Sequence, residues 1–575
     1  MISRRQLILG TSSLAALTLV NRPVYPSPDH GPADLIMTSG EIHTVDATNS
    51  RVAAMAVRQG RILATGTVSD IDAHRGPGTR VINLDGRTVL PGINDSHLHL
   101  QGWAMSRPPY ALDLTYPRVN SIQDVVDAVA AAVANRQASD WIIGRGWDQA
   151  YFQESRAPSR ADLDAVAPRN PVALTEFSGH AVWLNSVALK IAGINRDSIA
   201  EAGGVIVRDD AGEPTGLLFE GPAFRLRHLV PAPDALTKQN AVIDAMTALS
   251  ARGITSATDP GLSPEDLDIY GDIASQSDTT RLRMTGMLQA GVSTDTLGNA
   301  LNGWKNLQSP APDWLRLSAV KIMGDGIPTS NKTAWLNEPY ASGGNGSLLV
   351  AGNSHQDRIT QLRAMVVMIH ETGLQAGIHV TGSRSIDEAV AACAAAQAAH
   401  PRQDPRHYLI HADLVSEMTL DRMAQLGIGA NFNPEIKHLI ADSQVASIGP
   451  VRAAYEWPYR SALAAGVKTA SSSDAPVTEG NWLQGIATCM DRRGKQSGLV
   501  SGPAQRINLD EAIRTYTIAG AWQDHAEHYK GSLEVGKAAD FCVLDGRLSE
   551  SSTVDMPNMQ VAMTAINGRI VHDRL

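Results

Sequence analysis

Four histidines and one carboxylate stand at, or just after, short apolar runs of this sequence. His97 and His99 form a His-x-His pair, His379 and His411 each end a later run, and Asp474 follows another. Neutral imidazole nitrogen and carboxylate oxygen are ligands that suit zinc and similar divalent ions. Residues two apart in an extended segment face the same side, so the pair can present both imidazoles to one ion. The set predicts a divalent metal site.

Lys321 lies on a further apolar run and could complete such a site. An ammonium group offers no lone pair to a metal, but a buried, neutral lysine can add carbon dioxide and become a carbamate. The pKa of lysine falls readily on burial, and the carbamate would bridge ions roughly 3.5–4 Å apart. We therefore expect two divalent ions per chain, most simply Zn²⁺, with Lys321 carboxylated between them.

Each of these residues also has a purely structural explanation. A lone histidine is more often a hydrogen-bonded core residue than a ligand, Asp474 could be a helix N-cap before Pro476, and Lys321 could pair with Asp325. The metal interpretation is favoured because all of them recur along one regular series of strand-like runs.

The elements that must position these side chains alternate between strand and helix. The helical stretches include Gln356–Glu371, Ser385–Ala399 and Met418–Leu426. Such a series predicts an α/β protein with a (β/α)8 TIM barrel, whose active site lies at the carboxyl ends of the strands. The eight expected strands are Val89–Asn94, Ile254–Asp259, Leu282–Gln289, Arg316–Met323, Leu374–His379, His407–His411, Ile428–Asn433 and Val467–Ser472.

The segment Gln101–Arg252 interrupts this series after the first strand. A structureless loop of such length is rare in a compact domain, so a large inserted subdomain is expected. It leaves directly from the first metal strand and should roof the pocket. Its own predicted elements are strands at Trp141–Gly144 and Pro171–Thr175 and helices at Gln123–Asn135 and Thr237–Ala251.

Both ends of the chain are rich in short strands separated by turn residues. At the carboxyl end, Asn567-Gly568 is a hairpin signal before Arg569–His572. The two ends are expected to form one small β-sandwich. The expected division of the chain is a signal peptide and linker at 1–32, the two parts of the sandwich at 33–88 and 529–575, and the barrel at 89–528 with its insert at 101–252. The expected sandwich strands are Asp34–Thr38, Ala53–Arg58, Arg61–Thr65, Thr79–Leu84, Ala539–Leu544 and Val561–Ile566.

The first residues resemble an export signal. Arg4 and Arg5 precede Leu7–Val20, an uncharged stretch too short for a confident membrane span. Adjacent arginines resemble a twin-arginine signal, which exports proteins already folded, so a periplasmic location is expected. An ordinary secretory signal or an uncleaved anchor is the alternative, because no clear A-x-A cleavage site is visible. No stable membrane span is expected once the signal is removed.

Composition excludes several other classes. The chain has 575 residues, a formal net charge of −10 and no basic footprint for nucleic acid. Its three cysteines, Cys393, Cys489 and Cys542, form no CxxC pair, so neither a thiolate zinc site nor a disulfide framework is indicated. Neither a P-loop nor an HExxH motif is present. The expected partner is a small-molecule substrate, and a homo-oligomer is possible.

At these residues the chain resembles the amidohydrolase superfamily, and within it the YtcJ-like branch, amidohydrolase family 3. The similar stretches run through nearly the whole chain after the signal, and the ordered set is far more specific than His-x-His alone. They are Val89–His99, Gly146–Asp148, Pro158–Arg160, Leu163–Asp164, Gly179–Ser186, Val320–Ile322, Asp325–Gly326, Ser473–Val477 and Gly531–Asp540.

The resemblance implies a role for each residue. His97 and His99 would hold one ion, His379 and His411 the other, Lys321 would bridge as the carbamate, Asp474 would bind metal and act as general base, and His180 would stabilise the oxyanion. Two positions depart from the branch: Ser383 stands where an acidic residue is usual, and Ile410 where Glu is usual. Neither change removes a ligand, but both bear on the surroundings of the ligands and on substrate range.

The expected function is metal-dependent hydrolysis of an amide-type, non-peptide C–N bond by metal-activated hydroxide, with Asp474 as general base. A one-metal deaminase, a non-hydrolytic isomerase or decarboxylase, and a periplasmic small-ligand binding protein are the alternatives. Trp103, Trp147 and Trp482 are expected near the pocket, where an indole could stack on the substrate. Ordinary packing is the competing explanation for each of them.

Overall fold

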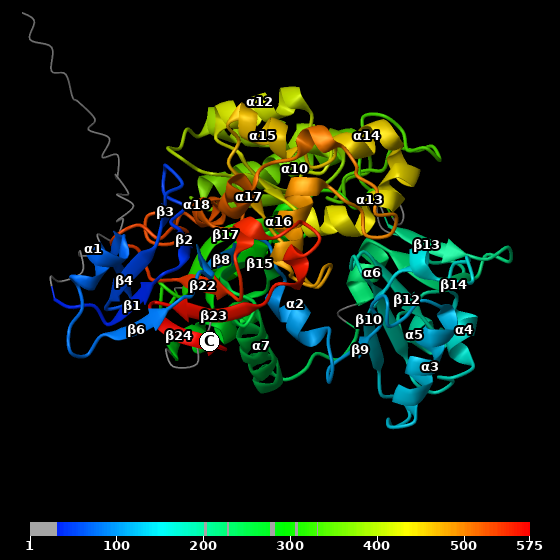
Figure 1. The fold of residues 1–575 in the computed structure, drawn as a ribbon. Helices are drawn as coiled ribbons and strands as arrows, with labels where there is room; N and C mark the ends of the chain where they lie inside the picture. Colours follow the sequence, from blue (N-terminus) through cyan, green and yellow to red (C-terminus); the bar gives the residue numbers. More distant parts are fainter. Residues whose placement is uncertain (1–30, 201–203, 227–228, 277–281, 305–308, 330–331) are drawn as a thin grey trace, which may run out of the picture.

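The centre of the protein is an eight-stranded parallel sheet that curls into a nearly closed barrel (Figure 1). The structure, a computed structural model, describes residues 31–200, 204–226, 229–276, 282–304, 309–329 and 332–575. Each barrel strand falls on one predicted run, so the predicted (β/α)8 fold is confirmed. In chain order the strands are β8 (Ile93–Asp95), β15 (Ile254–Leu262), β16 (Arg283–Gln289), β17 (Leu315–Met323), β18 (Gln375–Val380), β19 (Tyr408–His411), β20 (Gly429–Phe432) and β21 (Thr469–Ser471).

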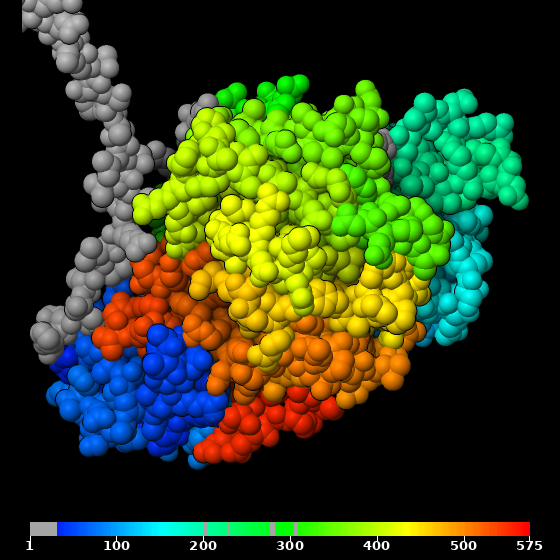
Figure 2. Space-filling model, turned by 90° about the horizontal axis from the view of Figure 1, so that it is seen from above, coloured from blue at the N-terminus to red at the C-terminus, as the bar shows by residue number. Residues whose placement is uncertain are grey.

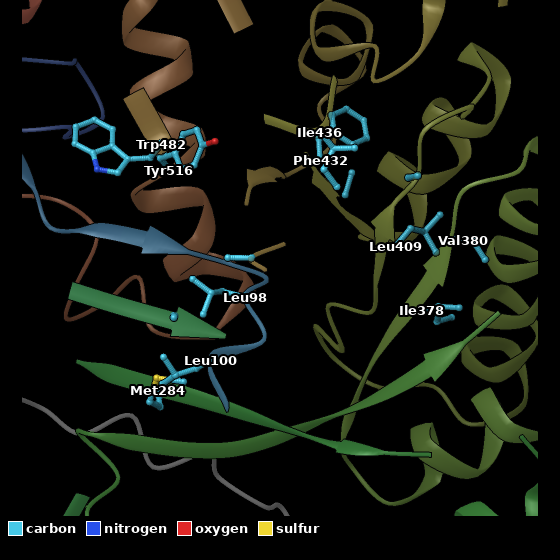
Figure 3. Packing of buried hydrophobic residues seen from close by; sticks show 14 of the residues in the cluster. Leu98, Leu100, Met284, Ile378, Val380, Leu409, Phe432, Ile436, Trp482 and Tyr516 are labelled. Carbon is cyan, nitrogen blue, oxygen red and sulfur yellow. The ribbon is translucent and has the colours of Figure 1, made fainter. Parts of the chain in front are cut away.

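Barrel strands are buried on both faces, which explains why their sequences are continuous apolar runs and do not alternate. All residues of β18 and β19 are buried. Helices α10 (His355–Glu371) and α11 (Ser383–Ala399) pack against each other and against β18. Figure 3 shows buried side chains of this core, among them Ile378 and Leu409, between the strands and the helices around them.

The first predicted strand is wrong in one respect, because Val89–Asn94 is two strands in two different sheets. β7 (Thr88–Pro91) pairs with strands from both ends of the chain, and only β8 enters the barrel. The chain turns at Gly92, where a Cβ atom would lie 2.1 Å from the hydroxyl oxygen of Thr255. Only glycine fits this close approach, so Gly92 is the point at which the chain leaves one sheet for the other.

The two ends of the chain form the β-sandwich that the sequence predicts. A four-stranded sheet (β5-β4-β1-β6) faces a six-stranded sheet (β24-β23-β22-β7-β2-β3), and one apolar core joins them. Asn567 and Gly568 both have positive φ at the turn between the last two strands, as a tight hairpin requires. The strands are β1 (Leu35–Thr38), β2 (Glu41–His43), β3 (Arg51–Val52), β4 (Ala54–Arg58), β5 (Arg61–Gly66), β6 (Arg80–Asn83), β22 (Phe541–Leu544), β23 (Val561–Ile566) and β24 (Arg569–Asp573).

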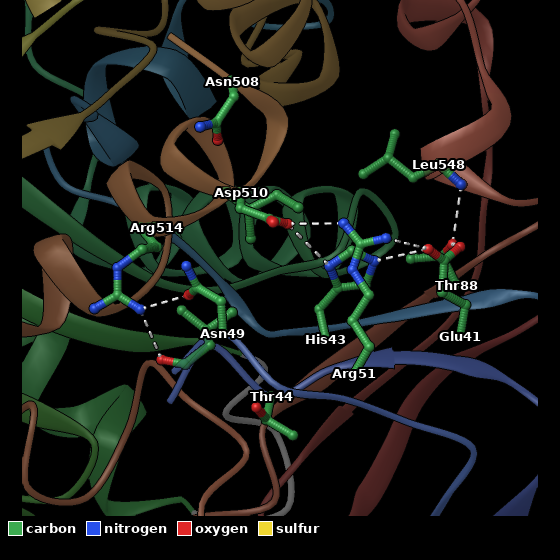
Figure 4. Close-up of polar contacts among 12 residues, drawn as sticks. Glu41, His43, Thr44, Asn49, Arg51, Thr88, Asn508, Asp510, Arg514 and Leu548 are labelled. Atoms are coloured by element: carbon green, nitrogen blue, oxygen red, sulfur yellow. Dashed lines mark hydrogen bonds and ion pairs between the residues drawn. The ribbon is translucent and has the colours of Figure 1, made fainter. Parts of the chain in front are cut away.

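A polar cluster fastens the sandwich to the barrel at helix α17 (Leu509–Thr515) (Figure 4). His43 lies 3.3 Å from the carboxylate of Glu41, and Arg51 lies 3.0 Å from Asp510 on the helix. The contacts that cross to Asp510 come from Arg51, which is partly exposed, and from His43, which is shielded from solvent and lies 3.7 Å from that carboxylate.

The insert is a separate lobe beside the barrel, in the cyan to teal part of Figure 1. Its six-stranded sheet has the order β13-β14-β12-β11-β10-β9 and its own apolar cores. The predicted helix at Thr237–Ala251 is α7 (Ala235–Ser250), and it packs on the barrel core, not on the insert. The insert contains β9 (Leu112–Asp113), α3 (Ile122–Val133), β10 (Ile142–Trp147), α4 (Arg160–Asp164), β11 (Val172–Glu176), β12 (Ala181–Leu184), α5 (Ser186–Ile191), β13 (Val205–Arg208), β14 (Pro214–Phe219) and α6 (Gly221–Leu226).

The expected signal peptide and linker lie almost wholly outside the described residues, which begin at residue 31. Among the helices that are described, none has both the length and the apolar character to cross a membrane. The three cysteines are buried as free thiols.

Figure 2 shows the insert from above as a teal lobe against the yellow and green surface of the barrel helices.

Candidate metal centre

The predicted ligands come from strands all around the barrel and lie at its carboxyl rim. His97 and His99 follow β8, and His99 is the residue from which helix α2 (Leu100–Met105) begins. The pair therefore lies beyond the strand and not within an extended segment. The expectation that strand alternation turns both imidazoles to one side was wrong. The remaining predicted residues are Lys321 within β17, His379 within β18, His411 at the end of β19 and Asp474 after β21.

His97, His99 and Asp474 converge despite this difference. The Nε2 atom of His97 lies 3.3 Å from Oδ1 of Asp474, and that of His99 lies 3.4 Å from the same oxygen. One ligand atom from each of the three lies within 4.8 Å of the others. His97 is fully buried, whereas the side chain of His99 is 38% exposed. Such a cluster can hold one divalent cation.

Unpaired atoms at this cluster fit a cation. Nε2 of His97 and Oδ1 of Asp474 approach to 3.3 Å without forming a hydrogen bond, and among the described residues neither of these atoms nor Nδ1 of His97 has a hydrogen-bond partner, although all are buried. Burial lowers the pKa of His97 well below its usual value, which leaves the imidazole neutral. Burial alone would raise the pKa of Asp474, but His97 and His99 hold it well below its usual value. Neutral imidazole and ionised carboxylate are the forms that bind metals.

A second group of rings continues from the first. The ring centroids of His97 and His411 are 5.4 Å apart, those of His411 and His379 are 4.4 Å apart, and those of His379 and His180 are 5.4 Å apart. Burial lowers the pKa of His411 to about 4 and that of His379 well below its usual value. A continuous row of imidazoles therefore crosses the rim, and burial keeps those of His97, His379 and His411 neutral.

Two neighbours fix the orientation of His411. Its Nδ1 lies 2.7 Å from Oδ1 of Asn433, whose amide nitrogen donates to Ser472, so Nδ1 carries the proton and Nε2 keeps its lone pair. The indole N–H of Trp457 donates to the carbonyl oxygen of His411 at 3.0 Å. His411 and Asp474 also have positive φ (69° and 57°), a strained conformation that is typical of functional sites.

Lys321 is buried in the barrel wall among these groups. Burial lowers its pKa to about 8, although the charges of Asp474 and Asp259 oppose the shift. A substantial neutral fraction near pH 8 is what carbamate formation requires. Asp325, its alternative partner in the sequence, instead accepts hydrogen bonds from the backbone N–H groups of Thr381 and Gly382.

The insert contributes His180, which the resemblance singled out. Its Nδ1 lies 2.8 Å from Oε2 of Glu220, and the hydroxyl of Thr333 donates to the other oxygen of Glu220 at 2.5 Å. His180 lines one cavity together with His379, His411 and Asp474. The insert therefore closes over the barrel rim and supplies a side chain to the site.

The three tryptophans predicted to bind substrate do not line this cavity. Trp147 packs in the core of the insert and donates to Leu174, and Trp103 and Trp482 pack in the barrel core. Each is at most 3% exposed, so packing explains them. The tryptophan that does line the cavity is Trp457, which the sequence analysis missed because it lies far from any quoted motif.

Two residues that orient the histidines of the site, Asn433 and Glu220, were also not predicted from the sequence. Asn433 directly follows the seventh barrel strand, a position that could have indicated a role at the rim. Glu220 lies on the insert, where the sequence carries no signal of its pairing with His180. Of the departures from the branch, Ser383 accepts from the backbone N–H of Asn337, and Ile410 is buried among apolar side chains. Neither lines the cavity.

Known proteins resemble this chain along most of its length. A family model described as the amidohydrolase family matches residues 80–572. The chain is 30% identical over 546 residues to the protein LONG AFTER FAR-RED 3 of Arabidopsis thaliana, with 93% of this chain and 91% of that protein covered. It is 28% identical to YtcJ of Bacillus subtilis (strain 168), which is named as an amidohydrolase (94% and 99% covered), and to the N-substituted formamide deformylase of Arthrobacter pascens (94% and 98% covered).

Solved structures share the fold. An uncharacterized metal-dependent hydrolase from Pyrococcus furiosus superposes with a TM-score of 0.67 at 23% identity, covering 89% of this chain and 98% of that one. A second such hydrolase, from Pyrococcus horikoshii OT3, superposes with a TM-score of 0.70 at 18% identity, covering 91% and 99%. At these identities the likeness concerns the fold alone.

Proposed function

We propose, from the premise that this chain belongs to the amidohydrolase family and is a metal-dependent hydrolase, that it cleaves an amide-type C–N bond other than a peptide bond. The predicted resemblance to the YtcJ-like branch is confirmed by the relatives that match nearly the whole chain. The observation that carries the proposal is the convergence of His97, His99 and Asp474 within 4.8 Å, with buried atoms that lack hydrogen-bond partners in the described chain.

The proposed ligand set divides into two halves. His97 and His99 would hold one divalent ion and His379 and His411 a second, both most simply Zn²⁺. Lys321, buried and with its pKa lowered to about 8, would join the halves as a carbamate. When bound, such ions supply Lewis acidity and lower the pKa of a coordinated water.

Two residues of the chain would transfer the proton of the attacking water and stabilise the negative charge that develops on the carbonyl oxygen. Asp474, ionised at neutral pH, would take a proton from the attacking water and pass it to the leaving nitrogen. His180 would stabilise the oxyanion, and the contact of its Nδ1 with Glu220 at 2.8 Å would hold the ring in position for that role.

The cavity supports a substrate with an apolar part beside the reacting bond. Apart from the polar residues of the site, its lining includes Phe177, Ile327, Ile436, Trp457 and Val477. One relative is named N-substituted formamide deformylase, which supports the choice of an amide with a substituted nitrogen. Esters and carbamates share the same carbonyl chemistry, and the assay must include them.

A one-metal deaminase is the second candidate. It is favoured by one observation, that only His97, His99 and Asp474 group tightly enough within the described chain to form a ligand set. Counting ions distinguishes the two candidates, because a single-ion site does not need the bridge at Lys321.

The test is metal content together with activity. The purified protein is analysed for metals by inductively coupled plasma mass spectrometry and assayed on matched amides, carbamates, esters and aminopurines. Two ions per chain and hydrolysis of amides that is lost on chelation support the proposal. One ion with release of ammonia from an aminopurine would replace it with the deaminase.

Export to the periplasm stays part of the proposal and rests on the sequence alone. The paired Arg4-Arg5 and the uncharged stretch after them motivate it. Replacement of both arginines by lysine should retain the protein in the cytoplasm if the twin-arginine route is used. Fractionation of cells that express each form would measure this.

A further inference from the structure

A second, larger cavity adjoins the one at the metal centre. The inner cavity has a volume of about 40 Å³, enough for only a few water molecules, whereas the outer one has about 250 Å³. Phe177 of the insert and Val477 of the barrel line both. A substrate with its reacting bond at the metal centre therefore has room for its remainder on the outer side of these two residues.

The outer cavity offers a flat aromatic wall. The rings of Tyr116 and Tyr151, both from the insert, stack at 4.1 Å with planes 16° apart. The ammonium of Lys495 lies 5.6 Å from the Tyr116 ring. Leu439 and Pro476 add apolar surface from the barrel side. Such a wall suits a planar ring, which can stack or pack edge-on against the tyrosines.

One residue that lines this cavity has a buried polar atom without a hydrogen-bond partner in the part of the chain that the structure describes. Glu435 lines the cavity from the first turn of α13 (Pro434–Ile448) and is 4% exposed. Its Oε2 accepts from the backbone N–H of Asn481 at 2.8 Å and from the hydroxyl of Thr478 at 3.0 Å. Among the described residues, its Oε1 has no hydrogen-bond partner. A buried carboxyl oxygen left in this state is costly, which points to a ligand group that completes it.

The protonation of Glu435 narrows the chemistry of that group. Burial raises the pKa of Glu435 to about 8, so near neutral pH the carboxyl is present in both forms. The protonated form donates from Oε1 and the ionised form accepts there. A hydroxyl group can pair with either form, because it donates and accepts.

We propose that the outer cavity is a specificity subsite for the nitrogen substituent of the substrate, which is an aromatic ring bearing a hydroxyl group that hydrogen-bonds to Glu435. The ring lies against Tyr116 and Tyr151, and Phe177 and Val477 flank the link to the reacting bond. This assignment rests on the proposed amide hydrolysis and names its substrate class.

Direct binding tests the subsite without turnover. Isothermal titration calorimetry on the metal-loaded protein compares 4-hydroxyphenethylamine with phenethylamine, the amines that the corresponding amides would release. The hydroxylated amine should bind about tenfold more tightly, the size of one satisfied hydrogen bond to a buried group. Equal affinity of the two amines for the native protein overturns the assignment, whatever the variants do.

Variants then locate the preference. Glu435→Met should abolish the hydroxyl preference, and Glu435→Gln should retain most of it, because the amide still pairs with a hydroxyl. Glu479→Met is the matched control, since Glu479 lines the same cavity but is exposed, and it should keep the preference. Tyr116→Leu, at a position 40% exposed, should weaken both aromatic amines and serves if Glu435→Met does not fold. Loss of the preference in Glu479→Met but not in Glu435→Met would contradict the role of Glu435.

Kinetics separate this inference from the function on which it rests. The value of kcat/KM is measured for the acetamides of the two amines and for N-methylacetamide. Hydrolysis of all three amides without a preference for the hydroxylated one would overturn the subsite but would agree with the proposed amide hydrolysis. No hydrolysis of any amide, with hydroxyl-selective binding of the amines, would overturn the bond assignment and leave a binding pocket for hydroxylated aromatic amines.

Discussion

Asp95 receives both hydrogen-bond donors of Ser473, the backbone N–H at 3.0 Å and the hydroxyl at 2.5 Å. Asp95 ends β8, and Ser473 follows β21 and immediately precedes Asp474. β8 and β21 are the two end strands of the barrel sheet, and strand pairing does not join them. The backbone N–H of Asp474 also donates to the carbonyl oxygen of His97 at 2.9 Å. These bonds close the barrel at the point where two proposed ligands meet.

Ser473→Ala should therefore weaken both the fold and the metal site. The loss leaves a buried carboxyl oxygen without its donor and should lower the free energy of unfolding by about 1–3 kcal/mol. Metal affinity should fall about tenfold, since an outer partner of the ligands is gone. Thermal unfolding and metal titration measure the two effects. Ser318→Ala is the control, because the buried hydroxyl of Ser318 has no hydrogen-bond partner among the described residues; a like effect of both variants would refute the argument.

Asp474→Asn should remove the proposed general base while preserving the shape of the side chain. We expect kcat to fall by about 10²–10⁴-fold with the fold intact. Circular dichroism and metal content, measured together with the rate, separate loss of the base from loss of the ion. Asp413→Asn is a matched control in the same cavity, because burial raises the pKa of Asp413 well above its usual value and an amide resembles its neutral form. Near-normal turnover by Asp474→Asn would refute the role.

Lys321→Met should reduce the metal content from two ions per chain to one. The variant fills the same buried space but cannot form a carbamate, so the bridge between the ions is lost. Metal analysis of both proteins measures the number. In the native protein, ¹³C-labelled bicarbonate should give a carbamate resonance that is absent from the variant. Two ions retained in Lys321→Met, or no such resonance in the native protein, would contradict the bridge.

His180→Ala should lower kcat by about 10²–10³-fold with a smaller change in KM, as expected for a donor that acts on the transition state. Glu220→Gln should give a smaller loss in the same direction, because a neutral amide would hold the ring of His180 less firmly than the carboxylate 2.8 Å away. Steady-state kinetics on one amide measure both variants. A rise in KM with kcat unchanged would instead assign His180 to substrate binding.

Acid should destabilise the protein through His407, at the opposite end of the barrel from the metal centre. Its Nδ1 accepts from the backbone N–H of Ala376 at 2.9 Å, and its Nε2 donates to Nδ1 of His370 at 2.8 Å. Nε2 of His370 donates in turn to the carbonyl oxygen of His400 at 2.6 Å. Burial lowers the pKa of His407 to about 3. Neither ring can take up a second proton without losing a hydrogen bond.

The direction of the pH effect follows from that lowered pKa. Between pH 6.5 and 3 the unfolded chain binds more protons at His407 than the folded one, so stability falls as pH falls through this window. The loss is at most about 1.4 kcal/mol per pH unit. His407→Asn keeps an acceptor for Ala376 but does not titrate, so its melting temperature should fall less between pH 7 and pH 4.5. An identical fall in both proteins would exclude His407 as the cause.

The barrel could be predicted from the sequence because its strands are buried on both faces and leave continuous apolar runs. The site residues could be listed for the same reason, since the chemistry recurs at the ends of those runs. The division of Val89–Asn94 could not be read, because both halves are apolar and only the contact of Gly92 with Thr255 separates them. The attachment of α7 to the barrel depends on tertiary packing that periodicity does not record.

The pocket walls were harder to predict than the ligands. The sequence does not indicate which core Trp147 and Trp482 enter, and their indole N–H groups donate to the backbone carbonyls of Leu174 and Arg252. Trp457, Glu220 and Asn433 act through contacts between segments far apart in the chain. Such partners follow from the arrangement of loops over the barrel, which local sequence does not specify.

The arrangement of the six-stranded sheet bears on how the protein is made. β7 is synthesised before the barrel, but its neighbour β22 begins only at Phe541. Until the ribosome has delivered that segment, β7 presents an open edge to the cell, which is a template for aggregation. A nascent chain that stalls after the barrel should therefore need chaperone protection, and completion of the fold must follow synthesis of nearly the entire polypeptide.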